Sequence, residues 1–521
     1  MKAYSKLLSL VSITFCLIIF ILFGMIKIDF SISDLGRHLT NGRLFLENHT
    51  IIRTNYYSYT EPDFPVVTHH WGSGIIFYLI YQIFGFNGIS VFVSIISLLA
   101  FLFFYIVAIK RAGVSVASLI FISLLPLINV RTEPRPEIFS YLLAGFFYWI
   151  LLKFKENKLS FKFLFFLPTF MIFWVNFHIY FFLGIVIIGA FLLEALILKR
   201  GRFGKYTLYL IFIFMLTHFA ALINPFGFSG AVAPYKIFNN YGYKVLENQN
   251  VWYLEKIITN EPYFLIFKIM LVIFVLTYIL GWYMRKEKLS LADLFLGGFF
   301  AVLSIMAIRN ITIFALFALP IMAANISASF GKKILGKIQD MLSSTVAGFL
   351  IFIFLLTITG SLVKIFPKLA FFGIGLFPGE NLSAEFFKKE GLKGPIFNNY
   401  DIGGYLIFHL FPKEKVFVDN RPEAYSVDFF QKVYIPMQND EQVWKEMLRK
   451  YNFNTIYFQR WEQTEWSAQF LSRRINDPEW APVFTDLYAI ILVRRNKENA
   501  EVIKKFEIPK ENFRLVPKNK H

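Results

Sequence analysis

The first 366 residues alternate between long apolar runs and short polar connections. A membrane-crossing helix needs roughly 20 apolar residues, and about eleven runs approach that length. They cover residues 7 to 27, 88 to 109, 114 to 130, 137 to 153, 161 to 177, 179 to 198, 206 to 223, 262 to 283, 290 to 308, 311 to 329 and 343 to 366. The pattern predicts an α-helical polytopic membrane protein in which several helices are short or bent.

From about Phe377 the apolar runs shrink to the length of strands, and segments of helical period lie between them. The strand-like runs are Val416 to Val418, Thr455 to Phe458 and Ala489 to Val493. The helical segments are Ser426 to Val433, Glu441 to Tyr451 and Thr464 to Arg474. Strands that alternate with helices indicate a small α/β domain. We expect it to cover residues 377–521, after a transmembrane domain over residues 1–370.

Basic residues gather at every second connection, as they do in cytoplasmic loops. The groups are Lys2 and Lys6, Lys110 and Arg111, Lys153 to Lys158, Lys199 to Lys205, Arg285 to Lys288, and Lys332 to Lys337. This distribution predicts an integral protein of the plasma (inner) membrane with a cytoplasmic N-terminus and an extracytoplasmic C-terminal domain. The first apolar run is longer than that of a signal peptide and has no small-residue cleavage site before Asp29, so we expect it to be a retained helix.

Composition agrees with this class, since 56% of the residues are hydrophobic and the mean hydropathy is +0.54. The net charge of +18 lies largely at helix ends, where it anchors helices and contacts membrane lipids. We therefore expect no nucleic-acid partner. A single cysteine, Cys16, excludes a disulfide framework within the chain.

The polar loop after the first run, residues 28–87, contains a predicted helix. Four polar residues recur at intervals of three and four and share one face: Asp34, Arg37, His38 and Asn41. Three leucines face away: Leu35, Leu39 and Leu46. The spacing predicts an amphipathic helix on the membrane surface, with its apolar side in lipid. An ordinary solvated face with an Asp34–His38 pair is the alternative.

Several segments of the chain together resemble a known enzyme superfamily. They are Asp34-Leu-Gly-Arg-His38, Arg53-Thr-Asn-Tyr-Tyr-Ser-Tyr-Thr60, Thr68-His-His-Trp71, Arg135-Pro-Glu137, Trp174-Val-Asn-Phe-His178, Asn224-Pro-Phe-Gly227 and Arg309-Asn310. Over residues 1–370 the chain resembles GT-C membrane glycosyltransferases. It is most similar to the glycosyltransferase family 39-like proteins, which are related to protein O-mannosyltransferases and aminoarabinose transferases.

The C-terminal region is similar to the outer domain of some of these bacterial proteins, in the stretches 397–405 and 416–421. The likeness assigns no activity to that domain. We interpret Gly403 and Gly404 as a backbone requirement rather than a phosphate-binding loop. Asp419 and Arg421 are interpreted as a turn-stabilising pair.

The resemblance implies a GT-C-like fold with about eleven transmembrane helices and a catalytic first outer loop over residues 28–87. It further implies transfer of a sugar from a polyprenyl-phosphate donor to a glycan, lipid or protein acceptor outside the cytoplasm, in the making of a cell-envelope glycan. Such a reaction needs a general base and a cationic clamp on the departing phosphate. By match to the family's loop acid, Asp34 is the expected base.

Ten further residues are candidates for substrate binding. Guanidinium suits bidentate binding of phosphate, which favours Arg37, Arg53, Arg135 and Arg309. The remaining polar candidates are His38, His69, His70, Glu137, Asn176 and His178. Glu137 is either a second acid in the site or part of a structural ion pair. Several imidazoles near one surface suit a divalent ion, but adjacent histidines rarely ligate one metal together, so we expect neither a metal nor another cofactor.

The chain departs from the family's pattern at two positions, because Asn55 stands where related sequences often carry an acid and Leu35 stands where an aromatic residue is usual. Asp29 remains as a second acid. A non-catalytic carrier of lipid-linked sugar, or a transporter, is the alternative function. Charges gathered at the outer helix ends, without duplicated halves, favour the enzyme. A glycan ligase is a third possibility that only the acceptor distinguishes.

Overall fold

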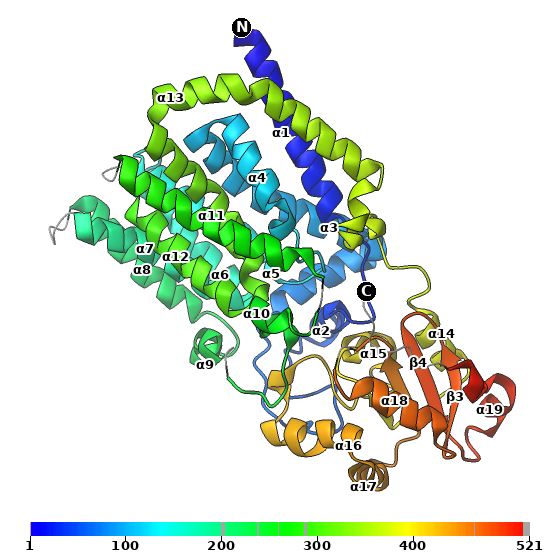
Figure 1. The fold of residues 1–521 in the computed structure, drawn as a ribbon. Helices are drawn as coiled ribbons and strands as arrows, with labels where there is room; N and C mark the ends of the chain where they lie inside the picture. Colours follow the sequence, from blue (N-terminus) through cyan, green and yellow to red (C-terminus); the bar gives the residue numbers. More distant parts are fainter. Residues whose placement is uncertain are drawn as a thin grey trace.

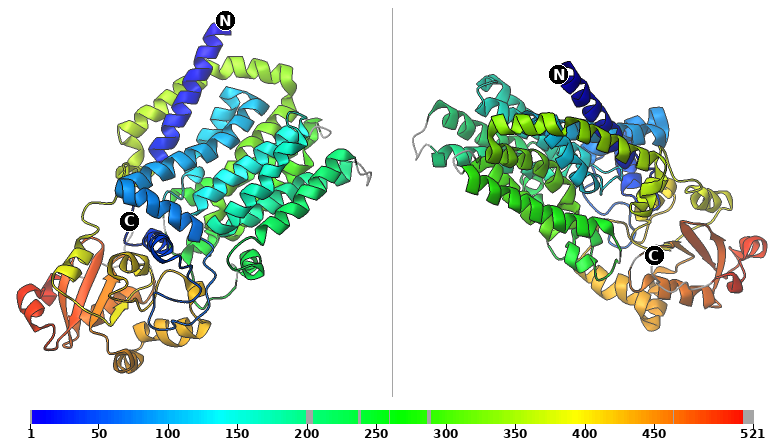
Figure 2. Two further views of the ribbon diagram at one scale, coloured as in Figure 1. Left: turned by 180° about the vertical axis from the view of Figure 1, so that it is seen from behind. Right: turned by 45° about the horizontal axis from the view of Figure 1, so that its top comes forward.

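The computed structural model describes residues 2–198, 204–236, 239–258, 260–285, 289–462 and 464–513. These residues form a bundle of apolar helices with a small α/β region attached to one end (Figure 1). The N-terminus lies at the other end of the bundle, and two further views show the same arrangement (Figure 2). We call the end that carries the α/β region the domain face and the other end the opposite face.

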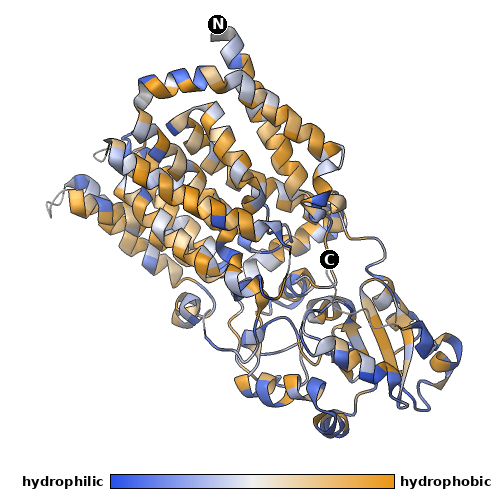
Figure 3. Ribbon diagram, viewed as in Figure 1, coloured by the Kyte–Doolittle hydropathy of each residue, from blue (hydrophilic) through white to orange (hydrophobic). Residues whose placement is uncertain are grey.

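Seven helical segments of the described chain are long and apolar enough to cross a membrane. They lie in α1 (Lys2–Gly24), α3 (Trp71–Ala112), α5 (Glu137–Lys155), α7 (Phe182–Leu198), α11 (Pro262–Arg285) and, twice, α13 (Ile311–Ile358). The shorter apolar helices are α4 (Val114–Ile128), α6 (Phe166–Phe177), α8 (Lys205–Ala221) and α12 (Leu291–Met306). All the predicted apolar runs are thus helical, and the predicted polytopic fold is confirmed. Figure 3 shows how closely the apolar residues follow the bundle.

Two glycines break long helices at positions of positive φ. Gly85, with a φ of 62°, separates a short first part of α3 from the part that crosses the bundle. Gly331, with a φ of 70°, divides α13 into its two long segments. Residues with a Cβ rarely adopt such angles, so each glycine permits the chain to change direction.

Short helical turns connect these helices. They are η1 (Phe161–Phe165), η2 (Ile179–Phe181), α9 (Phe228–Ala231), η3 (Ala233–Lys236), η4 (Leu246–Asn248), α10 (Val251–Leu254), η6 (Ile308–Asn310), η7 (Ser361–Lys364) and η8 (Pro367–Phe371). The turns η4 and η6 hold residues of the candidate site described below.

The C-terminal region contains a four-stranded mixed sheet in the order β1-β2-β4-β3. Its strands are β1 (Ile396–Asn398), β2 (Thr455–Gln459), β3 (Trp480–Thr485) and β4 (Ala489–Arg494). β1 pairs parallel to β2, and the other two pairs are antiparallel. Val416 to Val418 is wrong as a strand of this sheet, because Val416 instead forms an isolated bridge with Ser58 of the first loop.

Helices and turns surround the sheet. They are α14 (Leu382–Lys389), α15 (Gly403–Leu410), η9 (Pro422–Ala424), η10 (Phe429–Tyr434), α16 (Ile435–Asn439), α17 (Glu441–Tyr451), α18 (Ser467–Asn476), α19 (Ala500–Phe506) and η11 (Lys510–Asn512). The predicted segment 441–451 coincides with α17. The region therefore has the predicted α/β character.

The predicted amphipathic helix is present as α2 (Leu35–Asn48), but its surroundings differ from the prediction. Protein covers the first part of its apolar side, because Leu35 and Leu39 are fully buried in a hydrophobic cluster that includes Tyr405 and Leu406 of α15. Leu46, near the end of the helix, is exposed. The periodicity located the apolar stripe correctly, but it does not distinguish burial under protein from burial in lipid. The first loop and the C-terminal region consequently share one core.

Candidate functional site

Asp34 lies at the domain face, immediately before α2. One carboxylate oxygen is 3.5 Å from Nη2 of Arg37, and the other is 3.5 Å from Nη1 of Arg135. The side chain is about one-fifth exposed, so it is accessible to a substrate. Asp34 makes no capping hydrogen bond to α2, and its carboxylate is therefore not committed to holding the helix.

Three arginines converge on two glutamates beside Asp34. Arg131 and Arg135 come from the connection between α4 and α5, and Arg309 comes from η6. Glu137 begins α5 and accepts hydrogen bonds from Arg131 and from Tyr141, at 3.0 and 2.9 Å. We interpret Glu137 as an ion-pair residue on this basis, since its carboxylate is almost fully buried against these partners.

Glu247, in η4, joins all three arginines through one carboxylate. Its oxygens lie 3.0 Å from Arg131, 2.8 Å from Arg135 and 3.6 Å from Arg309. Burial alone would raise the pKa of Glu247, but the charges of these arginines outweigh burial and hold the pKa well below its usual value. The carboxylate is thus ionised and occupies the point where the three guanidinium groups meet.

Three histidines lie in a row next to this cluster. The ring of His70 is 5.3 Å from that of His38 on α2 and 5.3 Å from that of His178, which follows α6. Burial is the main cause that lowers the pKa of each well below its usual value, so all three are neutral imidazoles. Neutral imidazoles both donate and accept hydrogen bonds, which suits contact with hydroxyl groups.

His178 is held by a hydrogen bond of 2.8 Å between its Nδ1 and the Oγ of Ser140, which also accepts from Trp174. His38 differs, because its Nδ1 is buried and has no hydrogen-bond partner in the described part of the chain. Burial lowers the pKa of His69 to about 4. Residues 2–198, 204–236, 239–258, 260–285, 289–462 and 464–513 contain no group of three or more His, Cys, Asp or Glu side chains placed to hold a metal ion.

Two of the candidate residues stabilise loops instead of joining the cluster. Arg53 donates a hydrogen bond to the carbonyl of Pro225, at 3.0 Å, and its guanidinium lies over the ring of Phe226. Asn176 accepts a hydrogen bond from the indole of Trp71, at 2.8 Å. Asn176 also donates to the carbonyl of Ile223. These contacts link the first loop, α6 and the segment after α8.

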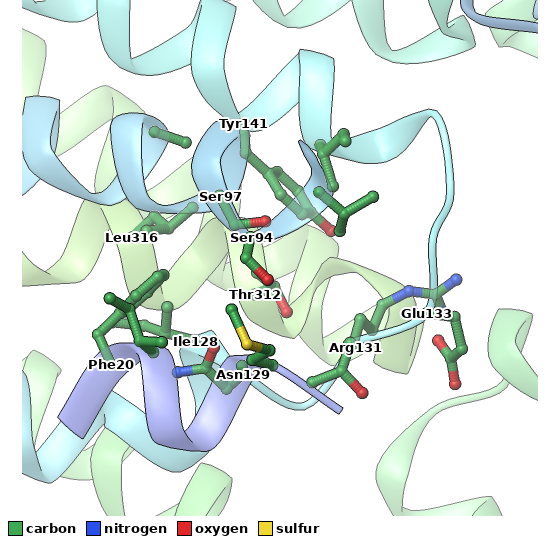
Figure 4. Close-up of a pocket in the computed structure, with 17 residues that line it drawn as sticks. Phe20, Ser94, Ser97, Ile128, Asn129, Arg131, Glu133, Tyr141, Thr312 and Leu316 are labelled. Atoms are coloured by element: carbon green, nitrogen blue, oxygen red, sulfur yellow. The ribbon is translucent and has the colours of Figure 1, made fainter. Parts of the chain in front are cut away.

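A narrow, mainly apolar pocket opens beside the arginine cluster, between α1, α3, α4, α5 and α13. Phe20, Ile128 and Leu316 are among its apolar walls (Figure 4). Arg131 and Glu133 lie at its polar end in the same view. The pocket therefore joins a largely apolar space to Arg131. Arg131 shares Glu247 with Arg135, the arginine that contacts Asp34.

Sequence reasoning missed Arg131 and Glu247. A signal for Arg131 existed, because charged residues alternate with others in Arg131-Thr-Glu-Pro-Arg135-Pro-Glu137. Glu247 lies in a connection without recognisable periodicity, and only the folded chain places it here. The expected turn pair of Asp419 and Arg421 is present and buried, with a contact of 2.6 Å, and Arg421 also donates to Asn55.

No protein-family model matches the chain, and no curated protein does. Among solved structures, the chain is similar to ArnT from Cupriavidus metallidurans, whose crystal structure contains undecaprenyl phosphate. The two are 12% identical, and the match covers 94% of this chain and 98% of ArnT with a TM-score of 0.44. A likeness this low does not establish a family, so the function has to be inferred from the site itself.

Proposed function

We propose that this protein is a membrane glycosyltransferase that transfers a sugar from a polyprenyl-phosphate donor to an acceptor outside the cytoplasm. One observation carries the proposal: a mainly apolar pocket ends at Arg131, beside Arg135, which contacts Asp34. A lipid tail, a phosphate and a general base need these three environments side by side.

The arrangement matches the parts of a lipid-linked donor. The apolar walls of the pocket suit an isoprenoid chain, whose burial is favourable in proportion to its area. We expect Arg131 and Arg135 to bind the phosphate oxygens, because guanidinium binds phosphate in a bidentate manner. Glu247 now takes the place between the arginines, and we expect the donor phosphate to replace its carboxylate there.

The reaction is a displacement at the anomeric carbon of the sugar. The acceptor hydroxyl forms a bond to this carbon while the bond to the phosphate oxygen breaks. Asp34 takes the hydroxyl proton, and the arginines stabilise the charge that develops on the departing phosphate. In this scheme Arg135 binds the leaving phosphate and Asp34 meets the acceptor. The two side chains lie only 3.5 Å apart.

The proposed orientation follows from the helix ends. α3 and α5 both start near the site and end with basic residues, Lys110 and Arg111 in α3 and Lys153 and Lys155 in α5. Basic residues gather on the cytoplasmic side of membrane proteins. We infer that the opposite face is cytoplasmic and that the site and the C-terminal region lie outside.

The test is transfer of a radiolabelled sugar from polyprenyl-phosphate donors to a membrane extract by the reconstituted protein. Asp34→Asn keeps the shape of the side chain and removes the base, so we expect turnover to fall about 10²- to 10⁴-fold while donor binding persists. Asp428→Asn is the matched control, because Asp428 forms an exposed ion pair with Lys432 in the C-terminal region.

The outcomes separate the alternatives. Equal turnover in Asp34→Asn and Asp428→Asn would remove Asp34 from the mechanism. Donor binding without turnover in the wild type, across the sugars and extracts tested, would support a non-catalytic carrier of lipid-linked sugar instead.

A further inference from the structure

One turn of the C-terminal region, residues 399–402, lies close to the segment of the first loop that contains Asp34. The side-chain amide of Asn399 donates to the carbonyl of Gln459, at 3.0 Å, and its oxygen accepts from the Gln459 amide, at 2.9 Å. The backbone amide of Tyr400 donates to the hydroxyl of Tyr434, at 2.8 Å. These buried hydrogen bonds fix the conformation of the turn.

Close packing fixes the turn against the first loop. α15 starts directly after it, and a Cβ atom on Gly36 would lie 2.3 Å from the carbonyl oxygen of Gly404. A Cβ atom on Gly404 would in turn lie 2.8 Å from the carbonyl oxygen of Ser33. Asp34 lies between Ser33 and Gly36, so the backbone contacts place the start of α15 next to the proposed base.

Asp401, in this turn, is an acid without a partner. Its carboxylate forms no ion pair and accepts no hydrogen bond within residues 2–198, 204–236, 239–258, 260–285, 289–462 and 464–513. Glu137, Glu247 and Asp419 each contact an arginine instead. Asp401 is only partly buried, so its carboxylate is open to a ligand. An acid that stabilises no partner of its own, next to a proposed site, is a candidate for substrate contact.

The charges around Asp401 come from three other parts of the chain. Burial is the main cause that raises its pKa to about 6, and the negative charges of Asp34 and Asp29 add to this, while Arg135 opposes it. The charge of Asp401 also acts on Glu462, after β2. Burial and then the charge of Asp401 raise the pKa of Glu462 to about 8, so Glu462 is neutral at pH 7. The charges of the proposed base and of one arginine of the phosphate clamp thus both act on Asp401.

Two buried polar atoms on α2, next to Asp34, have no hydrogen-bond partner among the described residues. They are the Nε of Arg37 and the Nδ1 of His38. Buried polar atoms nearly always have a partner in a functional state. Together with the free carboxylate of Asp401, they indicate a polar ligand in this space.

We propose that Asp401 is a substrate-binding residue that the C-terminal region supplies to the active site, where its carboxylate accepts hydrogen bonds from hydroxyl groups of the donor sugar. This inference rests on the proposed function. A sugar whose phosphate is bound by Arg135 and whose anomeric carbon is attacked beside Asp34 lies between these two residues. The backbone contacts of Gly36 and Gly404 hold the turn that carries Asp401 against this part of the first loop. The partner chemistry is a hydroxyl-rich ring, for which a carboxylate is a strong acceptor.

The test compares two lipids that differ only in the sugar: polyprenyl phosphate and the same lipid carrying a hexose. Binding to the purified full-length protein is measured for the wild type, Asp401→Asn and Asp428→Asn. We expect Asp401→Asn to weaken binding of the sugar-bearing lipid about ten- to hundredfold and to leave the bare lipid unchanged. Asp401→Glu, which keeps the charge, restores part of the loss.

A pH series gives a second readout that a structural role would not move. The ionised carboxylate is the better acceptor, so wild-type binding of the sugar-bearing lipid weakens as the pH falls through about 6. Asp401→Asn cannot titrate and lacks this dependence. The bare lipid shows no such difference between the two proteins.

Three results would overturn the inference: equal binding of the sugar-bearing lipid by wild type and Asp401→Asn, an equal loss for both lipids, or no binding of either lipid by the wild type. Transfer activity is scored separately. A wild type that binds the sugar-bearing lipid but transfers nothing would refute the transferase function, and the two-lipid comparison would still decide the role of Asp401.

Discussion

Replacing Gly36 by alanine tests whether contact between the C-terminal region and α2 sets the geometry of the site. The new Cβ would lie 2.3 Å from the carbonyl oxygen of Gly404 and 3.1 Å from the Cβ of Phe408. Ordinary contact begins at 3.4 Å, so the backbone oxygen has to withdraw by about 1.1 Å. The obstacle is main chain, which no rotamer change relieves.

We expect an overpacking cost at the upper end of the usual range, about 3 kcal/mol. Alanine gains about 1 kcal/mol over glycine in a helix, which leaves a net loss of about 2 kcal/mol in the free energy of unfolding. The displacement also separates Asp34 from the turn that carries Asp401. A misplacement of about 1 Å can lower a reaction rate about 10²-fold.

The assay is thermal unfolding in detergent together with sugar transfer, and Gly336→Ala in α13 is the matched control. A Cβ atom on Gly336 meets nothing within 4 Å, so this variant has the helix gain without the clash. If Gly36→Ala and Gly336→Ala have the same stability and the same transfer activity, the steric reasoning is refuted. Lost stability with full transfer would show that this contact does not position the catalytic groups.

Two further predictions concern carboxylates. Glu247→Gln removes the anion that joins three arginines, so we expect the free energy of unfolding of the lipid-free protein to fall by about 1–3 kcal/mol. Polyprenyl phosphate should then stabilise this variant more than it stabilises the wild type, as measured by thermal shift. Burial and then the neighbouring Asp29 raise the pKa of Glu380 to about 9, so the folded protein holds a proton that the unfolded chain releases near 4.5. Stability therefore falls as the pH rises through this window, and Glu380→Gln reduces the slope in unfolding measured at several pH values.

The helical bundle could be predicted because the membrane imposes a length on every crossing segment. The C-terminal sheet was harder to predict from the sequence. β1 has only three residues, and β3 contains Pro482, which weakens a strand pattern. Val416 to Val418 has the composition of a strand, but it packs against the first loop. Short apolar runs thus predict burial more reliably than they predict a partner.

The site was predictable where its residues lie in one recognisable segment. The structure brings Asp34 and Arg37 together with Arg135, and it places Glu137 near Arg309. It also aligns His38, His70 and His178. Those residues came from helix spacing or from motifs at helix ends. Whether they bind substrate, as proposed, depends on the experiments above.

Asp401 could not be predicted as a neighbour of Asp34, because no periodicity relates residues at opposite ends of a chain. The glycine pair offered a partial signal, since two small residues at a helix start permit close backbone approach. A Cβ atom on Gly403 would lie 2.4 Å from the Cα of Asp419. A Cβ atom on Gly404 would lie 2.8 Å from the carbonyl oxygen of Ser33. The sequence predicted a backbone requirement at this position, and the fold supplies the partner.

The C-terminal region is best understood as one wall of the site and not as a cover over it. The buried pair of Asp419 and Arg421 reaches Asn55, and the guanidinium of Arg421 lies over the ring of Tyr57. Tyr57 donates to Asn41 on α2, at 2.6 Å, which links the C-terminal region to the helix that follows Asp34. A shared apolar core reinforces this chain of contacts, so the C-terminal region and α2 pack as one unit. The position of the proposed base therefore depends on residues from both ends of the chain.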